Sequence, residues 1–331
     1  EPFEQPSQRA LMTEEPESYS GAPSMFWDNL ADLHRRQLAQ YGVGEIKRHQ
    51  ALKYFTWGWR WSQLAKSEQF RFLVRHTRPR IWCAAACSPA DLSDGAWAGI
   101  PWSRADRWLY GFASRLLWEY ATAVDGTAQT LRLPEPTMGN PLPVKWRGRL
   151  ISQDLANSAL EIAAIRRALQ GREPAAILEV GAGYGRTAYA LLDMFPTATY
   201  TILDIDPARQ ISEWYLSNLY PGRTLRFVTP ADIPRLRGER FDLILSISSL
   251  QEMTFEQVNS YLKLFDETAA SGTVYLKQWR SWKNPDDDIT LTFDDYPVPS
   301  SWKLYFKEAS PVQTRFVQAA WHVMPAEAAN P

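Results

Sequence analysis

The run Ile177-Leu-Glu-Val-Gly-Ala-Gly-Tyr-Gly185 constrains the fold of this 331-residue chain more than any other feature. Residues 176–180 read as a short buried strand, and the helical apolar pattern after the glycines ends before Pro196. Glycines at such a strand–helix junction can make a tight turn and let a ligand approach the backbone at the helix N-terminus. The run therefore predicts a ligand-binding strand–turn–helix unit.

The second half of the chain alternates short β-branched runs with helical patterns, which favours βαβ units and a mostly parallel sheet. Strands are expected at residues 176–180, 200–203, 225–228, 241–247 and 273–276, and an antiparallel pair at 302–306 and 316–323. Helices are expected at 153–170, capped by Ser152 and closed by Gly171, at 207–219, with Pro207 in the first turn, and from a Thr254/Gln257 capping box to about 266. The fold class is therefore α/β.

The first half of the chain has a different pattern. Residues 1–24 hold five glutamates, one arginine and four prolines, a composition typical of a disordered tail. Residues 25–123 repeat apolar side chains at helical spacing and predict an all-helical region. Residues 133–143 are too rich in Pro and Gly for a helix or a central strand, and indicate a linker or a covering loop. We expect a tail to residue 24, a helical region with its linker at 25–150, and an α/β domain at 151–331.

Composition excludes several classes of protein. The net charge of −1 produces no overall field that attracts polyanions, so nucleic acid is not an expected partner. Cys83 and Cys87 are the only cysteines, which predicts neither a disulfide framework nor a zinc site. No apolar stretch approaches the ~18 residues of a membrane span, and we expect a cytoplasmic protein without a membrane partner. Ten of the 15 tryptophans precede residue 150, where they form either core or a stacking surface.

The glycine spacing distinguishes between nucleotide cofactors. A dinucleotide site usually has G-x-G-x-x-G, whereas here Gly185 comes one residue earlier. Glu179 would repel a pyrophosphate but suits the ammonium group of a methionine moiety. Asp204 ends the second strand about twenty residues downstream, where a carboxylate can accept both ribose hydroxyls. Glycines alone could simply end a strand, but together with these acids they indicate S-adenosylmethionine.

With these features the chain resembles class I S-adenosylmethionine-dependent methyltransferases. The resemblance implies a Rossmann-like seven-stranded sheet with an antiparallel last strand, here preceded by an all-helical domain that would cover the substrate. Residues 181–186, 247–253, 275–279 and 282–285 are similar to the sugar O-methyltransferase family, and the match runs from about residue 148 to the C-terminus. This narrower resemblance implies a small-molecule substrate that contains a saccharide. Asp206 departs from the pattern, which has a second proline before Pro207.

Ligands of open α/β sheets bind beyond the carboxyl ends of the strands, which locates the candidate site residues. The expected cofactor-binding residues are Glu179, Gly181, Gly183, Tyr184, Gly185, Asp204 and Ser248. Lys277 and Trp279 are the expected substrate-binding residues. Alternatively, Lys277 pairs with a neighbouring carboxylate, because a cation leaving an apolar strand needs a partner, and Trp279 packs against the C-terminal hairpin.

An alcohol acceptor must lose a proton, and Glu252 at the exit of the fourth strand is our candidate for the general base, next to Gln251. Alternatively, Glu252 only stabilises the N-terminus of the helix that begins near Thr254. His49 and His76 are rival bases, provided that the helical region brings either over the site. The acids at 286–288 are typical of a solvated turn, and no metal is expected.

The sequence thus predicts an S-adenosylmethionine-dependent O-methyltransferase of natural product biosynthesis, acting on a hydroxyl of a sugar or glycosylated small molecule. One alternative is an O- or N-methyltransferase of a non-sugar natural product, for which the Trp-rich region would form an apolar pocket. A second alternative is a cofactor-binding scaffold without catalysis. The oligomeric state is not predicted.

Overall fold

The computed structural model describes residues 24–49, 62–63, 67–88, 102–269, 271–284, 286 and 288–324. The predicted tail lies outside these residues except for Ser24, which caps the first helix. Four of the N-terminal tryptophans also lie outside them, namely Trp57, Trp59, Trp61 and Trp97. None of the described helices is long and apolar enough to cross a membrane.

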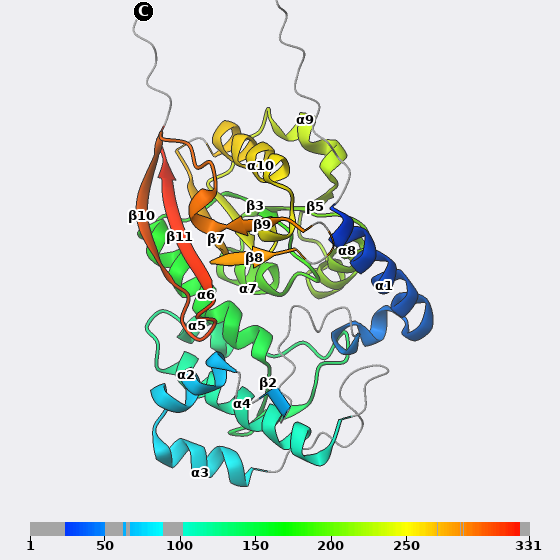
Figure 1. Ribbon diagram of the computed structural model, residues 1–331, viewed down its shortest axis with the longest axis vertical. Coiled ribbons are helices and arrows are strands. Elements are labelled where there is room, and N and C mark those ends of the chain that lie inside the picture. The colour runs from blue at the N-terminus through cyan, green and yellow to red at the C-terminus, as the bar shows by residue number, and fades with distance from the viewer. Residues whose placement is uncertain are drawn as a thin grey trace, which may run out of the picture.

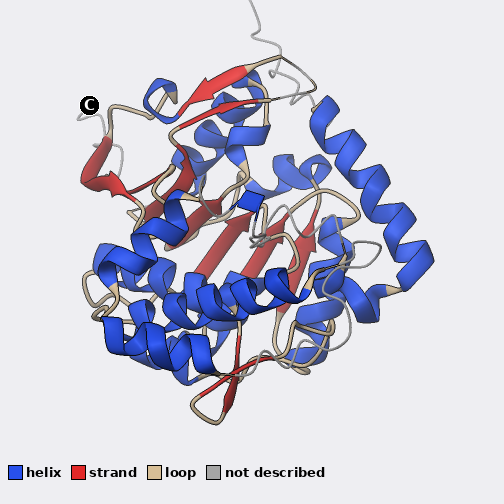
Figure 2. Cartoon of the chain, turned by 60° about the horizontal axis from the view of Figure 1, so that its bottom comes forward, coloured by secondary structure: helices blue, strands red, loops and turns tan. Residues whose placement is uncertain are grey.

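A seven-stranded sheet forms the centre of the second half, in the order β10-β11-β7-β6-β3-β4-β5 (Figures 1 and 2). The strands are β3 (Ala176–Val180), β4 (Thr199–Leu203), β5 (Leu225–Val228), β6 (Leu243–Ile247), β7 (Thr273–Trp279), β10 (Trp302–Ala309) and β11 (Phe316–Val323). β3 to β7 run parallel, whereas β11 is antiparallel to both β7 and β10. This arrangement confirms the expected Rossmann-like sheet with its antiparallel last strand.

Side chains of the sheet alternate between two apolar cores, as the twofold period of a strand requires. Ile177 faces the first core and Leu178 the second. The first core contains residues of α6 (Gln153–Leu169), α7 (Arg186–Met194) and α8 (Ala208–Leu219). The second contains residues of α9 (Ile233–Leu236) and α10 (Phe255–Thr268), with η4 (Pro230–Asp232) leading into α9. The helices thus cover both faces of the sheet.

The predicted helix ends agree closely with the structure. The Ser152 side chain accepts a hydrogen bond from the Leu155 N–H at the start of α6, and Thr254 and Gln257 form the expected capping box of α10. The position predicted for Pro207 was wrong by one residue, because it is the N-cap of α8 rather than part of its first turn. Boundaries of this kind are the least certain part of a pattern-based assignment.

The first half contains α1 (Met25–Tyr41), η1 (Val43–Arg48), α2 (Glu68–His76), α3 (Pro79–Cys87), α4 (Arg104–Thr122) and α5 (Ala128–Arg132). The described part of residues 25–123 is helical, as predicted, whereas the expected linker region also contains β1 (Val144–Trp146) and β2 (Arg149–Ile151), which form an antiparallel hairpin that was not predicted. Its two turn residues, Arg147 and Gly148, both have positive φ angles, of 48° and 80°. A two-residue turn with positive φ at both positions matches the twist of the flanking strands, and Gly is favoured at the second position.

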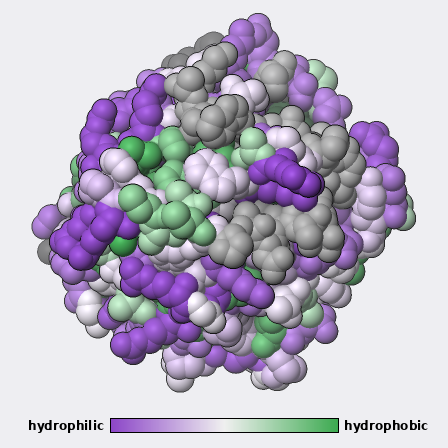
Figure 3. Space-filling view, turned by 90° about the horizontal axis from the view of Figure 1, so that it is seen from below, coloured by the Kyte–Doolittle hydropathy of each residue, from purple (hydrophilic) through white to green (hydrophobic). Residues whose placement is uncertain are grey.

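The helical half does not have a core of its own. Leu73 of α2 and Leu117 of α4 belong to the same buried cluster as Ile162 of α6. Most described tryptophans of this half are wholly or partly buried, including Trp102 and Trp118 in that cluster. The helices are therefore packed against the α/β half. Seen from below, the outer face of the helical half carries an apolar patch bordered by hydrophilic side chains (Figure 3).

Candidate functional site

The glycine turn joins β3 to α7, and each of its three glycines has a positive φ angle. A Cβ on Gly181 would lie 2.1 Å from Oγ and 2.3 Å from Cβ of Ser249, so this position has no room for a side chain. A Cβ on Gly185 would lie 2.9 Å from Leu216 of α8, whereas one on Gly183 would meet nothing within 4 Å. Gly181 therefore brings the turn against the exit of β6, and Gly185 lets α7 pack on α8.

Asp204 connects the glycine turn to the exit of β4. One carboxylate oxygen accepts the Gly183 N–H at 3.0 Å and the other accepts the Ile205 N–H at 2.8 Å. Burial raises the pKa of Asp204 to about 7 despite these hydrogen bonds. The carboxylate thus lies beside the turn, as the sequence predicts for a group that accepts ribose hydroxyls.

Glu179 precedes the turn on β3 and is buried. Its carboxylate accepts a hydrogen bond from the Tyr200 hydroxyl at 2.6 Å, and burial raises its pKa to about 7. Two acids with raised pKa values at the ends of neighbouring strands are typical of a binding site rather than of a structural ion pair.

These pKa values predict how stability depends on pH. Between about pH 4 and about pH 7 the folded chain keeps protons on Glu179 and Asp204 that the unfolded chain has lost, so their contribution to the free energy of unfolding decreases as the pH rises through this window. For the Asp204→Asn variant, the free energy of unfolding should decrease by on the order of 3 kcal/mol less over this pH window than for the wild-type protein. Urea denaturation at about pH 5 and about pH 7 measures it. Parallel pH profiles for the two proteins would contradict the prediction.

A cavity of about 140 Å³ opens at the carboxyl ends of β3, β6 and β7. It is lined by Gln69, Glu161, Glu179, Gly181, Ala182, Gly183, Tyr184, Arg186, Thr187, Ile247, Ser248, Lys277, Trp279, Gln313 and Phe316. Gln69 belongs to α2. The preceding residue of this helix, Glu68, accepts a hydrogen bond from the Thr314 hydroxyl in the loop between β10 and β11. The helical half therefore contributes to the wall of this cavity.

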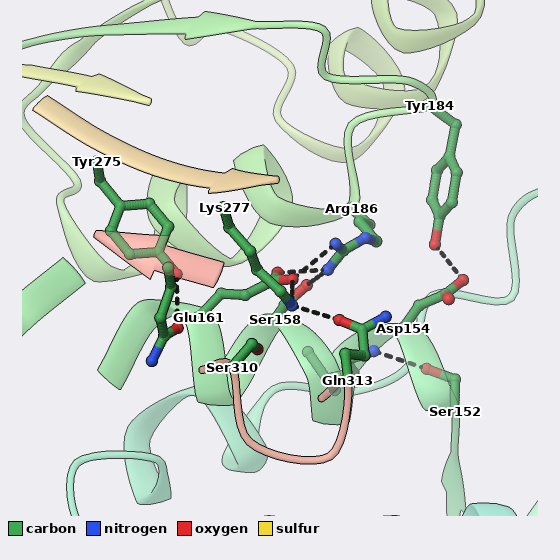
Figure 4. Close-up of polar contacts among 12 residues, drawn as sticks. Ser152, Asp154, Ser158, Glu161, Tyr184, Arg186, Tyr275, Lys277, Ser310 and Gln313 are labelled. Atoms are coloured by element: carbon green, nitrogen blue, oxygen red, sulfur yellow. Dashed lines mark hydrogen bonds and ion pairs between the residues drawn. The ribbon is translucent and has the colours of Figure 1, made fainter. Parts of the chain in front are cut away.

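One wall of the cavity is a buried network of charged side chains (Figure 4). Glu161 of α6 accepts hydrogen bonds from Arg186 at 2.6 and 2.9 Å and from the Lys277 ammonium at 2.7 Å. Burial alone would raise the pKa of Glu161, but the two cations lower it to about 2. Lys277 also donates to Gln313. The structure thus shows Lys277 in an ion pair with a carboxylate, which is one of its two predicted roles.

Tyr184 of the glycine turn also lines the cavity, and its hydroxyl donates to Asp154 of α6 at 2.5 Å (Figure 4). Its ring packs edge-on against Tyr215 of α8 at a centroid distance of 5.3 Å. Tyr184 therefore ties the turn to the first turn of α6.

Gln251 joins the exits of β6 and β7. Its side-chain NH2 group donates to Ser248 Oγ at 3.1 Å, and its side-chain oxygen accepts a hydrogen bond from the backbone N–H of Trp279 at 2.6 Å. Ser248 has a positive φ of 59°, and its N–H donates to the Lys277 carbonyl at 2.8 Å. The Trp279 ring contacts Phe316 as well as Trp282, so it both lines the cavity and packs against the C-terminal strands. Gln251 thus positions two residues of the cavity wall.

The candidate bases do not line this cavity in the described part of the chain. Glu252 ends η5 (Leu250–Glu252), where its carboxylate is buried and accepts a hydrogen bond from Gln251 at 3.4 Å. His49 is buried after η1 against Tyr41, and burial lowers its pKa. His76, on α2, is exposed and stacks on Phe72. Their catalytic roles therefore stay predictions.

No metal cluster of three or more His, Cys, Asp or Glu side chains occurs among the residues that the structure describes. In the acidic run that follows β8 (Ser281–Lys283), Asp288 pairs with Lys283 at 2.6 Å, and Asp287 lies outside the described residues. The hairpin continues into β9 (Thr290–Thr292) and η6 (Phe293–Asp295).

Sequence reasoning missed several side chains of the site, chiefly Glu161, Asp154 and Gln313. Glu161 carried a usable signal, because a glutamate within an otherwise apolar helix face is rarely buried without a partner. Arg186 directly follows the glycines, but no local pattern marks it as a residue of the cavity wall. Gln313 lies in a loop without any local pattern, and only the fold brings it to the cavity.

Comparisons with known proteins give limited matches. No protein-family model matches the chain. A curated relative, the malonyl-[acyl-carrier protein] O-methyltransferase of Geobacter sulfurreducens, is 42% identical over 88 residues, which cover 26% of this chain and 32% of the relative. The match thus spans about a third of that protein's length.

Similar solved structures include the N-methyltransferase NodS from Bradyrhizobium japonicum WM9 in complex with S-adenosylhomocysteine, with 15% identity, a TM-score of 0.38, and coverage of 50% of this chain and 85% of that one. The glycopeptide N-methyltransferase MtfA complexed with S-adenosylmethionine has 15% identity, a TM-score of 0.37, and coverage of 51% and 94%.

Proposed function

We propose that this protein is an S-adenosylmethionine-dependent methyltransferase. The observation that carries the proposal is the glycine turn, with Asp204 bonded to Gly183 on one side and Glu179 in the adjoining cavity wall on the other. Gly181 lines the cavity and has no side chain, as the close approach of a ligand to the backbone requires. The name of the curated relative supports the same reaction.

S-adenosylmethionine would supply a sulfonium-bound methyl group, and the chain has to orient it and exclude water. Asp204 would accept the ribose hydroxyls through lone pairs that its two backbone hydrogen bonds leave available. Glu179 would pair with the ammonium group of the methionine moiety, for which it must be ionised. Gln251 would keep Ser248 and Trp279 in place at the reacting end.

We further propose an oxygen acceptor on a sugar or a glycosylated small molecule. Trp279, Gln69 and Gln313 line the cavity, and an aromatic side chain beside amide side chains suits a saccharide. The second candidate is a carboxyl oxygen of a malonyl thioester, which the name of the relative favours. Turnover of a non-sugar natural product, or cofactor binding without any turnover, would point to a different function.

Incubation with S-adenosylmethionine and separate panels of saccharides, natural products and malonyl-acyl carrier protein tests the proposal. Mass spectrometry should find one acceptor that gains the mass of a CH2 group, together with an equal amount of S-adenosylhomocysteine. Binding of the cofactor without its consumption in any of the acceptor panels would indicate a cofactor-binding scaffold without catalysis. No binding of either S-adenosylmethionine or S-adenosylhomocysteine would refute the proposed function.

Asp204→Ala should weaken S-adenosylhomocysteine binding by about 1.5 to 3 kcal/mol, because a charged acceptor of two hydroxyl hydrogen bonds is lost. Isothermal titration calorimetry measures the difference. Asp206→Ala is the matched control, since this carboxylate lies on the same turn but bonds to Arg209 and Gln210. Equal affinities of the two variants would mean that Asp204 does not contact the cofactor.

A further inference from the structure

Lys277 is the most deeply buried cation of the cavity wall, with 3% of its surface exposed. An ammonium group has three N–H donors, and two of them are engaged, with Glu161 and Gln313. The third has no hydrogen-bond acceptor among the described residues. A buried charged donor without an acceptor is costly, because the desolvation of the charge is not fully compensated.

Arg186 lies next to Lys277 and also has unused N–H donors, although 18% of its side chain is exposed. Its guanidinium has five N–H donors, of which three are used, one with Ser158 and two with Glu161. Both cations share the single carboxylate of Glu161 and line the same cavity (Figure 4). The pair therefore offers donors that a bound anion can accept.

Glu179 lines the cavity as well, on the neighbouring strand β3. Burial raises the pKa of Glu179, whereas the positive charge of Arg186 lowers it. The cavity thus presents one carboxylate and two cations in its wall. An α-amino acid group, with its ammonium and carboxylate on one carbon, has the complementary pair of charges.

We propose that Lys277 and Arg186 bind the carboxylate of the methionine moiety of S-adenosylmethionine, while Glu179 binds its ammonium group. This inference rests on the proposed function and reassigns Lys277 from the substrate to the cofactor. Glu161 is then a positioning residue, because its two oxygens hold both cations at the cavity wall. The site would therefore discriminate between ligands by their amino-acid end.

The test compares S-adenosylmethionine with decarboxylated S-adenosylmethionine, which lacks only the carboxylate. Wild-type protein should bind the intact cofactor roughly 10- to 100-fold more tightly by calorimetry, the effect of hydrogen bonds to a charged group. Lys277→Met should lose most of this preference by weakening the binding of the intact cofactor alone. Lys277→Arg, which keeps the charge, should retain part of it.

Lys47→Met is the matched control for the loss of a buried ion pair. Lys47 pairs with Glu135 at 2.7 Å, the same distance as between Lys277 and Glu161, and it does not line the cavity. Thermal melts show how far each variant is destabilised, and Lys47→Met should keep the wild-type preference. An unchanged preference in Lys277→Met, or an equal loss of affinity for both ligands, would overturn the inference. Failure of wild-type protein to bind either ligand would instead refute the proposed function.

Discussion

Gly181→Ala should abolish measurable cofactor binding and lower the free energy of unfolding by about 2 to 5 kcal/mol. Part of this loss is the cost of a φ of 76° for a residue with a Cβ, which is about 1 to 2 kcal/mol. The rest comes from the contact with Ser249, which would be only 2.1 Å from the new methyl group. The turn and the exit of β6 would have to separate, and the cavity between them would change shape.

Gly171→Ala separates the two contributions. Gly171 has a φ of 82°, similar to that of Gly181, but a Cβ there would meet nothing within 4 Å, and it lies after α6 rather than in the cavity wall. Denaturant titration should show only the backbone cost for this control, and calorimetry should show unchanged cofactor affinity. An equal loss of stability in both alanine variants would mean that the contact with Ser249 adds nothing to the cost at Gly181.

Glu252→Gln should lower kcat by roughly 10²- to 10⁴-fold while cofactor affinity stays nearly unchanged. The substitution keeps the shape of the side chain and removes the charge that would take the proton from an alcohol acceptor. The carboxylate is buried at the exit of β6 and bonded to Gln251, the residue that holds Ser248 and Trp279. Single-turnover rates with an acceptor found in the screen measure the effect.

Glu256→Gln is the matched control, because Glu256 lies exposed in the first turn of α10 and shares only the interaction with the helix dipole. It should change stability by about 0.3 to 1 kcal/mol without altering the chemical step. Full-speed turnover by Glu252→Gln would leave Glu252 with a purely structural role. The search for the base would then turn to His49 and His76.

The candidate site was predictable where its signals are local. Gly181 and Asp204 were chosen as candidates because the turn and the strand end each show a short pattern, and in the structure a hydrogen bond between Gly183 and Asp204 joins the two segments. Glu252 was chosen for its position after a strand, and such a position does not determine whether a side chain faces the cavity. The hairpin at Arg147 was missed because its strands are only three residues long and show no period.

The sequence by itself determined the order of strands and helices, the caps of α6 and α10 and the glycine turn, because backbone preferences and apolar periodicity act over a few neighbouring residues. Only the tertiary structure decided which charges meet. Lys277 and Glu161 are 116 residues apart in the chain, yet their side chains bond because α6 packs on the face of the sheet to which Lys277 points. A buried charge must find its partner wherever the packed layers bring one, and no local pattern records that choice.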